Sequence, residues 1–257
     1  MQQRPVALVT GAGSGIGAAT ASRLVATGHD VVAVGRRPEP LEALRADHGE
    51  AIEVRLADLA DAERVVHLVR DVAARRGRLD VVVNNAGDAW QAGIEDTDPA
   101  RFRSLVEVNL VGPAAVVHAA WPTFLAQRRG CIVNVSSLAQ FDPFPGFFAY
   151  APSKAGLHLL TVVAANEGGP HGVRAFTVAP GVVDTPLHRR LVPDGVDDAF
   201  RLDADTVAGL VVACVAGVHD DAVGTTLAVV TPAVAPFVRD WMDRNPNGGV
   251  RIMELHR

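Results

Sequence analysis

The sequence predicts a single α/β domain in which helices flank a doubly wound parallel sheet of about seven strands. Apolar, strand-like runs alternate with amphipathic helical stretches from residue 5 to about residue 230. Most of the runs are continuous stretches of Val, Ile, Leu and Ala, which are typical of strands covered on both faces. Because no linker, repeat or low-complexity stretch interrupts the alternation, we expect residues 1–257 to form one domain.

Each element is placed by its apolar pattern and by the turn residues that bound it. We expect strands at residues 6–10, 30–35, 52–56, 79–84, 131–136, 173–178 and 225–230. Between and after them we expect helices at residues 15–26, 41–48, 61–75, 99–127, 150–166 and 204–218. The last stretch, 231–257, contains several prolines and a Gly248-Gly249 pair, so we expect an extension after the sheet is complete.

The composition is that of a globular protein, with 49% hydrophobic and 21% charged residues. A net charge of −5 argues against a nucleic-acid partner. No continuous apolar run reaches the roughly 18 residues of a membrane span, and no signal-peptide pattern follows Met1. Cys131 and Cys214 stand far apart in apolar surroundings, so we expect free core thiols. The histidines lack ligand spacing, so we expect no metal site. These features indicate a soluble, cytoplasmic protein without a membrane partner.

The chain has one tyrosine and one lysine, and they stand four residues apart as Tyr150 and Lys154. Arginine carries the other basic charges, whereas an ammonium is a compact point charge with a tunable pKa. Residues four apart share a helix face, so Lys154 can lower the Tyr150 pKa from its ordinary value of about 10. Such a phenol can exchange a proton with a carbonyl or alcohol oxygen. The alternative is a chance pair on a solvated surface.

A glycine-rich turn follows the first predicted strand, in the run Thr10-Gly11-Ala12-Gly13-Ser14-Gly15-Ile16-Gly17. Glycines at this place let the backbone turn tightly and approach a pyrophosphate, which then lies at the N-terminus of the following helix. The spacing is GxxxGxG and differs from the GxGxxG of the commoner dinucleotide fingerprint. The alternative is a purely structural turn. The position of the glycine-rich run between a strand and a helix favours nucleotide binding.

Over roughly residues 5–185, the chain resembles the classical short-chain dehydrogenase/reductase family, which implies a Rossmann-type fold. The motifs that carry the resemblance occur in the family's order: Thr10-Gly11 to Gly15-Ile16-Gly17, Asp58-Leu59, Asn84-Asn85-Ala86-Gly87, Asn109, Ser136-Ser137, Tyr150 with Lys154, and Pro180-Gly181-Val182-Val183-Asp184-Thr185. In this family the catalytic serine precedes the tyrosine by thirteen residues, which selects Ser137 over Ser136.

The resemblance implies roles for individual side chains. Tyr150 would be the general acid in reduction and the base in oxidation, and Ser137 would hold the substrate oxygen. Lys154 would lower the tyrosine pKa and bind the nicotinamide ribose, while Asn109 would anchor a water that passes protons through Lys154. The other residues that the resemblance places at the cofactor are Gly11, Ser14, Gly15, Ile16, Gly17, Asp58, Leu59, Asn85, Ala86, Gly87, Pro180, Gly181, Val183 and Thr185.

The end of the second strand indicates which nicotinamide cofactor is preferred. NAD-selective sites generally place an acid there for the ribose 2′-hydroxyl. Here the strand runs into Gly35-Arg36-Arg37, which carries two guanidinium groups and no carboxylate. A 2′-phosphate would receive charge-assisted hydrogen bonds, so we expect NADP(H) to be favoured over NAD(H). The alternative is a solvated arginine corner.

After Thr185 the chain departs from the family pattern. Residues 186–203 correspond to a short, variable substrate lid without a strong helical pattern, and the family's usual C-terminal ending is not visible. Four of the nine phenylalanines lie between Ser137 and Tyr150, which favours a bulky, apolar substrate. We therefore expect an NADP(H)-dependent oxidoreductase acting on a small-molecule carbonyl or secondary alcohol, in the ketoreductase direction.

Two other functions were considered on the same fold. One is a catalytically idle NAD(P)-sensing or scaffold protein, which the intact set Asn109, Ser137, Tyr150 and Lys154 argues against. The other is a lyase or epimerase, which the chain length and GxxxGxG spacing disfavour.

The resemblance also implies a homodimer or homotetramer associating through helices 99–127 and 150–166. The second of these is apolar on more than one face, as a buried or partnered helix is. The extension 231–257 carries Trp241, Met242, Ile252 and Met253, so we expect it to pack on its own domain or to reach a neighbouring subunit. The alternative is a monomer in which the extension covers the apolar helix.

Overall fold

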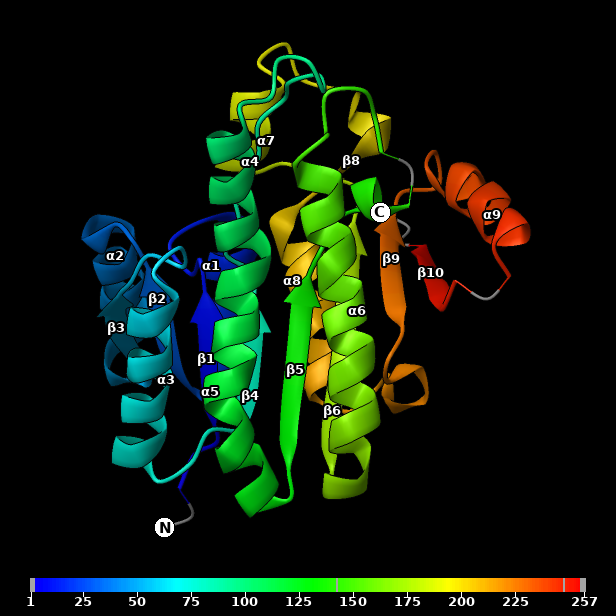
Figure 1. The fold of residues 1–257 in the computed structure, drawn as a ribbon. Helices are drawn as coiled ribbons and strands as arrows, with labels where there is room; N and C mark the ends of the chain where they lie inside the picture. The colour runs from blue at the N-terminus through cyan, green and yellow to red at the C-terminus, as the bar shows by residue number, and fades with distance from the viewer. Residues whose placement is uncertain (1–2, 142, 247, 255–257) are drawn as a thin grey trace.

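The computed structural model describes residues 3–141, 143–246 and 248–254, which form one parallel eight-stranded sheet in the order β10-β9-β6-β5-β4-β1-β2-β3 (Figure 1). In chain order its strands are β1 (Val6–Thr10), β2 (Asp30–Gly35), β3 (Ile52–Leu56), β4 (Val81–Asn84), β5 (Gly130–Val135), β6 (Val173–Pro180), β9 (Thr226–Val230) and β10 (Val250–Glu254). A separate parallel pair consists of β7 (Val182–Val183) and β8 (Arg201–Leu202). The predicted doubly wound sheet is confirmed, with one strand more than the seven expected.

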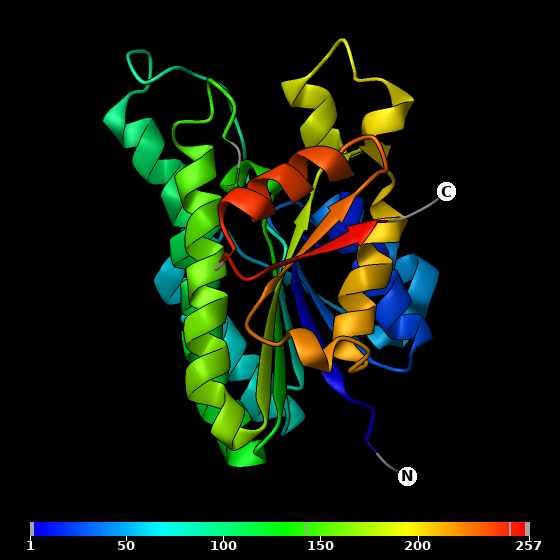
Figure 2. The same ribbon diagram turned by 90° about the vertical axis from the view of Figure 1, so that its right-hand side faces the viewer.

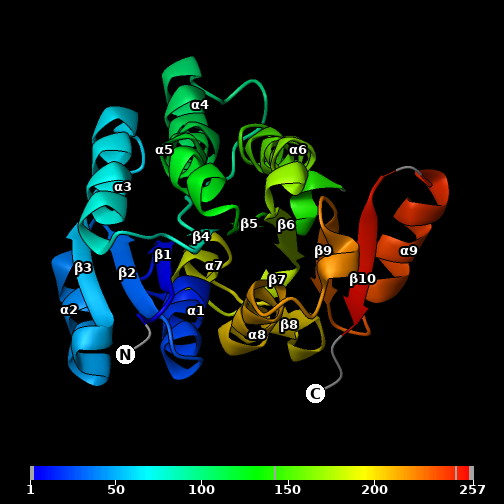
Figure 3. The same cartoon turned by 90° about the horizontal axis from the view of Figure 1, so that it is seen from below.

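Helices cover both faces of the sheet, as the view from below shows (Figure 3). One face carries α1 (Gly15–Ala26), α2 (Pro38–His48) and α8 (Ala204–Val215). The other face carries α3 (Ala62–Arg76), α5 (Gly112–Gln127) and α6 (Tyr150–Gly168). Because both faces are covered, every residue of β1, β5 and β9 is buried, which explains their continuous apolar runs.

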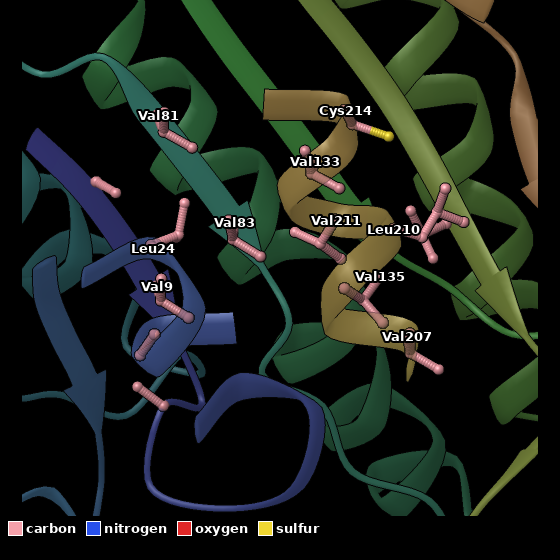
Figure 4. Close-up of a cluster of buried hydrophobic side chains, with 14 of the residues drawn as sticks. Val9, Leu24, Val81, Val83, Val133, Val135, Val207, Leu210, Val211 and Cys214 are labelled. Atoms are coloured by element: carbon pink, nitrogen blue, oxygen red, sulfur yellow. The ribbon is translucent and has the colours of Figure 1, made fainter. Parts of the chain in front are cut away.

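The layering produces an apolar core on each side of the sheet. The core beneath α1 and α8 contains Leu24, Val83 and Val211, among the side chains drawn in Figure 4. It also contains Cys131 and Cys214, both buried and unpaired, as the sequence predicted. The core on the other face packs α3 and α5 against the strands through residues such as Val69, Phe124 and Ile132. Close packing on both faces fixes the strand ends on which the loops are mounted.

The predicted helix 99–127 is divided into three parts. α4 (Pro99–Val106) passes into a π-helical segment, Glu107–Val111, before α5 begins at Gly112. π-helical segments are rare and are frequent at functional sites, and this one contains the predicted site residue Asn109. By length and composition alone Pro99–Gln127 could cross a membrane, although it is not a continuous apolar run. Half of its most apolar window is buried in the domain, where α5 packs against α3 and the sheet.

The largest departure from the sequence prediction lies after residue 230. There α9 (Ala235–Arg244) crosses above the carboxyl ends of the strands (Figure 2), and β10 then pairs in parallel with β9. The segment was expected to follow the completed sheet, but it supplies the eighth strand. β10 is short, and its apolar alternation comes after a proline and a glycine pair, so the sequence pattern does not reveal it. Its outer position covers the edge that β9 would otherwise expose.

Candidate active site

The carboxyl ends of the central strands open into one cavity of about 1140 Å³. Its lining comes from the segments that follow β1, β2, β3, β4, β5 and β6, together with parts of the chain after residue 185. Ligands of open parallel α/β sheets bind at this edge, outside the carboxyl ends of the strands. The cavity is therefore the candidate active site.

The glycine-rich turn forms the floor of this cavity beside the N-terminus of α1. Gly11 and Gly15 have φ angles of +67° and +54°, which L side chains rarely adopt. A Cβ atom on Gly17 would lie 2.2 Å from the Gly11 carbonyl oxygen, so the helix can approach the turn only through a glycine. The first N–H groups of α1 and its dipole then face the cavity, where they favour an anion such as a pyrophosphate.

The Asn84-Asn85-Ala86-Gly87 segment after β4 fixes the glycine-rich turn from the side. The Asn85 amide donates to the carbonyl oxygens of Thr10 at 3.0 Å and Gly11 at 3.3 Å. In return the Thr10 hydroxyl accepts from the backbone N–H groups of Asn85 and Ala86, each at 3.0 Å. These reciprocal bonds hold the ends of β1 and β4 at a constant spacing, as the sequence motif predicts.

Tyr150 and Lys154 lie on the first turn of α6, at the inner end of the cavity. The Lys154 side chain is only 4% exposed, and its Nζ donates to the Val135 carbonyl oxygen at 2.9 Å. Nζ lies 5.8 Å from the centre of the Tyr150 ring. Ser137 follows β5 and hydrogen-bonds the Tyr150 phenol. The structure therefore brings the three predicted groups together at one point.

The two adjacent serines after β5 have different environments. Ser136 is buried, and its hydroxyl donates to the Lys154 carbonyl oxygen at 2.9 Å, which ties β5 to α6. Ser137 is half-buried, and its hydroxyl accepts from the Ala139 N–H at 3.2 Å while facing Tyr150. This arrangement favours Ser137 as the group that meets a ligand and Ser136 as a structural residue.

The titration behaviour of the pair corrects one expectation. Burial raises the pKa of Tyr150 above its ordinary value, and the hydrogen bond from Ser137 only partly offsets this effect. The expected lowering of the Tyr150 pKa by Lys154 is wrong for the protein alone, because burial of the phenol has the largest effect and Lys154 Nζ donates to the Val135 carbonyl oxygen. Burial also lowers the pKa of Lys154 to about 8. At neutral pH the phenol is therefore protonated beside an ammonium that is close to its own titration.

Asn109 is fully buried and lies behind the cavity wall. Its Oδ1 accepts from the Asp88 N–H at 2.8 Å, and its Nδ2 donates to the Asp88 carbonyl oxygen at 2.9 Å and to the Ser153 hydroxyl at 3.0 Å. A Cβ atom on Gly87 would lie 3.2 Å from Asn109 Oδ1 and 3.3 Å from Lys154 Nζ. The missing side chain of Gly87 thus leaves space between the amide and the ammonium.

The two arginines after β2 line the opposite end of the cavity. The Arg36 side chain is 63% exposed, and its Nη1 lies 3.9 Å from an Asp58 carboxylate oxygen. Arg37 stands next to it as the N-cap of α2. Two cations therefore flank the region where the resemblance places the adenine end of a dinucleotide, with Asp58 as the nearest acid among the residues that line this end.

All predicted site residues line the cavity except two. Gly17 lies behind the glycine-rich turn, where it allows close packing, and Asn109 lies behind Gly87 and Asp88. Sequence reasoning did not identify Asp88, whose carboxylate forms an ion pair across the cavity with Arg190 of α7 (Pro186–Leu191). The position of Asp88, immediately after Gly87, is the signal that could have indicated it.

Sequence reasoning also did not identify the wall that α9 contributes. Val234, Phe237, Val238 and Trp241 all line the cavity. On its inner side this wall packs on β9 and β10, so the extension folds back onto its own domain, one of the two arrangements expected. The unusual apolar content of residues 231–257 was the only available signal.

Comparisons with known proteins identify the family of this chain. The family model for short chain dehydrogenases matches residues 5–195. An uncharacterised oxidoreductase of Staphylococcus epidermidis is 32% identical over 209 residues, which cover 80% of this chain and 89% of the relative. A solved short chain dehydrogenase/reductase family protein is 35% identical, with a TM-score of 0.81 over 89% of this chain and 97% of that one. The structure of ElxO with NADP bound is 25% identical, with a TM-score of 0.80 over 88% of this chain and 96% of that one.

The chain belongs to the short-chain dehydrogenase/reductase family. It is therefore a nicotinamide-dependent oxidoreductase of that family.

The buried ammonium predicts a pH-dependent stability. The pKa of Lys154 falls from 10.5 to about 8 on folding. Between these two pH values the folded protein binds fewer protons than the unfolded chain, so the destabilisation caused by burying the charge disappears as the pH rises. Relative to Lys154→Met, the wild-type protein should gain stability as the pH is raised from about 8 toward about 10, by up to about 3 kcal/mol. Urea unfolding of both proteins across this range measures the difference, and a difference independent of pH would contradict the buried, titrating ammonium.

Proposed function

We propose that this protein is an NADP(H)-dependent carbonyl reductase that also oxidises the corresponding secondary alcohol. The observation that carries the proposal is the cluster of Ser137, Tyr150 and Lys154 in the same cavity as the glycine-rich turn. The cradle fits a dinucleotide, because Gly11, Gly15 and Gly17 leave room for a pyrophosphate at the N-terminus of α1. When bound, the nicotinamide supplies or accepts the hydride.

The residues of the chain then orient the substrate oxygen and handle its proton. Ser137 and Tyr150 face the same point, where their hydroxyl groups can both hydrogen-bond a carbonyl oxygen. The raised pKa of Tyr150 keeps the phenol protonated at neutral pH, which suits a proton donor in the reducing direction. The Lys154 ammonium lies 5.8 Å from the centre of the Tyr150 ring, and the space beside Gly87 leads from Lys154 toward Asn109.

The cofactor preference rests on Arg36 and Arg37. Both line the cavity at the end of β2, where a carboxylate would select the 2′-hydroxyl of NAD. Their guanidinium groups favour a 2′-phosphate through charge-assisted hydrogen bonds. The Asp58 carboxylate near Arg36 does not reverse this preference, since it is paired with a cation and lies beyond the end of β3.

An idle NAD(P)-sensing or scaffold protein is the second candidate function. It would not require a proton donor, a serine and a buried ammonium to converge on one point of the cavity. Burying an ammonium at this position costs stability, since its pKa is depressed to about 8, and catalysis provides a reason to keep it. We therefore favour the enzyme over the sensor, acting on a bulky, apolar substrate in the cytoplasm.

We also propose that the protein assembles as a homodimer or homotetramer through α5 and α6. On α6 the side chains of Leu159 and Val163 are 64% and 51% exposed, whereas Leu157 is buried against the sheet. The exposure of Leu159 and Val163 supports a partner subunit at this face over a monomer in which the extension covers it. Light scattering at micromolar concentration should give a dimeric or tetrameric mass, and a strictly monomeric mass would contradict this assembly.

The proton donor can be tested by Tyr150→Phe. Loss of the phenol hydroxyl should lower kcat for carbonyl reduction at least about 100-fold, because general acid catalysis contributes on that scale. NADPH binding should stay within a few-fold of wild type, since the glycine-rich turn is untouched. Steady-state reduction of a ketone panel and NADPH fluorescence titration measure the two quantities. Near wild-type turnover by the variant would sink the assigned role.

The cofactor preference can be tested by Arg36→Asp. A charge-assisted contact contributes about 1.5–3 kcal/mol, so NADPH affinity should fall roughly ten- to hundredfold while NADH affinity holds or improves. Arg45→Asp is the matched control, because Arg45 lies on the exposed side of α2 and pairs with Glu42 away from the cavity. Equal affinity of the wild-type protein for NADH and NADPH would contradict the assignment of Arg36 and Arg37.

A further inference from the structure

Aromatic side chains are concentrated at the site. The chain contains nine Phe, three Trp and one Tyr, and seven of these thirteen residues line the candidate active-site cavity. Of those that do not, Phe124 and Phe176 are fully buried in the cores, where large apolar side chains are expected. Aromatic residues make up only 5% of the sequence, so their concentration at one cavity indicates a role in binding.

A first row of rings begins at the catalytic tyrosine. The Phe147 ring centre lies 5.3 Å from that of Tyr150, with the planes inclined by 49°. Phe144 follows at 6.2 Å from Phe147 in an edge-to-face arrangement, and its side chain is 60% exposed at the outer end. The row therefore leads from the reacting point toward the mouth of the cavity.

A second pair of rings is supplied jointly by the turn after Ser137 and by α9. The Phe141 and Trp241 ring centres lie 4.7 Å apart, and both side chains line the cavity. A Cβ atom on Gly248 would lie 2.7 Å from the Trp241 ring, so the indole is held against the backbone of the extension. Phe141 also packs against the small core formed by β9, α9 and β10. The extension is thus a fixed wall of the cavity.

Charged groups near these rings lie at the outer rim and are already engaged. Asp88 and Arg190 are paired with each other. The Asp197 carboxylate caps the short helix that follows it by accepting from the Ala199 N–H at 2.8 Å. Between this rim and the catalytic groups the lining includes Leu138, Leu187 and Leu191, together with His188, whose buried Nε2 has no hydrogen-bond partner among the described residues. Polar recognition is therefore available at Ser137 and Tyr150, with His188 as a further polar group.

We propose that the substrate carries its carbonyl or secondary alcohol on a flat, ring-bearing apolar body, and that Trp241 of the C-terminal extension selects for this shape. The inference rests on the proposed oxidoreductase function and names its substrate class. Two sets of rings that line one cavity can contact a planar body through offset or tilted stacking, which adds to the gain from burial. A flexible chain of equal size buries similar area without the stacking, and loses more rotational freedom on binding.

Three ten-carbon ketones separate shape from size: β-tetralone, its saturated counterpart β-decalone, and an open-chain methyl ketone. With NADPH, we expect kcat/KM for β-tetralone to exceed that for the open-chain ketone roughly tenfold or more, with β-decalone between them, as aromatic contacts contribute on this scale. Trp241→Leu and Phe144→Leu should each lower kcat/KM for β-tetralone several-fold through KM. Both variants should affect the open-chain ketone less than β-tetralone, because the open chain makes no stacking contact that the substitution removes.

Phe148→Leu is the matched control, since Phe148 belongs to the same loop, packs on Phe102 and does not line the cavity. Trp241→Phe should retain the preference for β-tetralone over the open-chain ketone. Comparison with Trp241→Leu then separates loss of the aromatic face from loss of packing. Calorimetric binding of β-tetralone to the Tyr150→Phe protein with NADPH gives a readout independent of turnover.

The outcomes distinguish the two proposals. Equal use of the three ketones by an active enzyme overturns the substrate class and leaves the oxidoreductase function standing. Preferred binding of β-tetralone without turnover of any ketone supports the aromatic site and contradicts the carbonyl reductase. A preference that persists in both Trp241→Leu and Phe144→Leu, or failure of β-tetralone to bind at all, overturns the inference.

Discussion

The carboxyl edge of the sheet is organised around one buried positive charge. The Lys154 ammonium has lost nearly all contact with solvent, and burial opposes its charged form. Its fixed partner is the carbonyl oxygen of Val135, the last residue of β5. The register of α6 on β5, held by the bond from Ser136 to the Lys154 carbonyl oxygen, therefore decides where the charge lies relative to Tyr150. An error of one residue in this register would separate the acid, the cation and the serine.

The neighbouring segments fit around this charge by leaving space or by fixing distances. Gly87 has no side chain, and a Cβ atom there would crowd both Nζ and the Asn109 amide. Asn109 lies in the π-helical segment, and its side-chain amide hydrogen-bonds both the N–H and the carbonyl oxygen of Asp88. These two bonds stabilise the loop after β4. Because Asp88 in turn pairs with Arg190, α7 is connected to the same loop. The positions of Lys154, Asn109 and α7 thus depend on one short stretch of chain.

Sequence reasoning succeeded where a local pattern reports a local cause. Continuous apolar runs identified β1 and β2 to the residue, because strands covered on both faces have no polar side. The pair Tyr150 and Lys154 could be placed on one helix face from spacing alone. Sequence reasoning failed where the cause is a tertiary contact between distant parts of the chain. The raised pKa of Tyr150 depends on burial, and the ion pair of Asp88 with Arg190 joins residues 102 positions apart. β10 forms because the edge of β9 is there to receive it, and no periodicity in five residues could show that.

The parallel direction of β10 has a practical consequence for anyone who handles the protein. Because β10 runs parallel to its neighbours, it starts at the edge of the sheet opposite the cavity and ends, at Glu254, on the same edge as the cavity. The last strand is also joined to the helix that carries Trp241 through the short segment between α9 and β10. An affinity tag or fusion partner placed before β1 is therefore separated from the cavity by the length of the sheet.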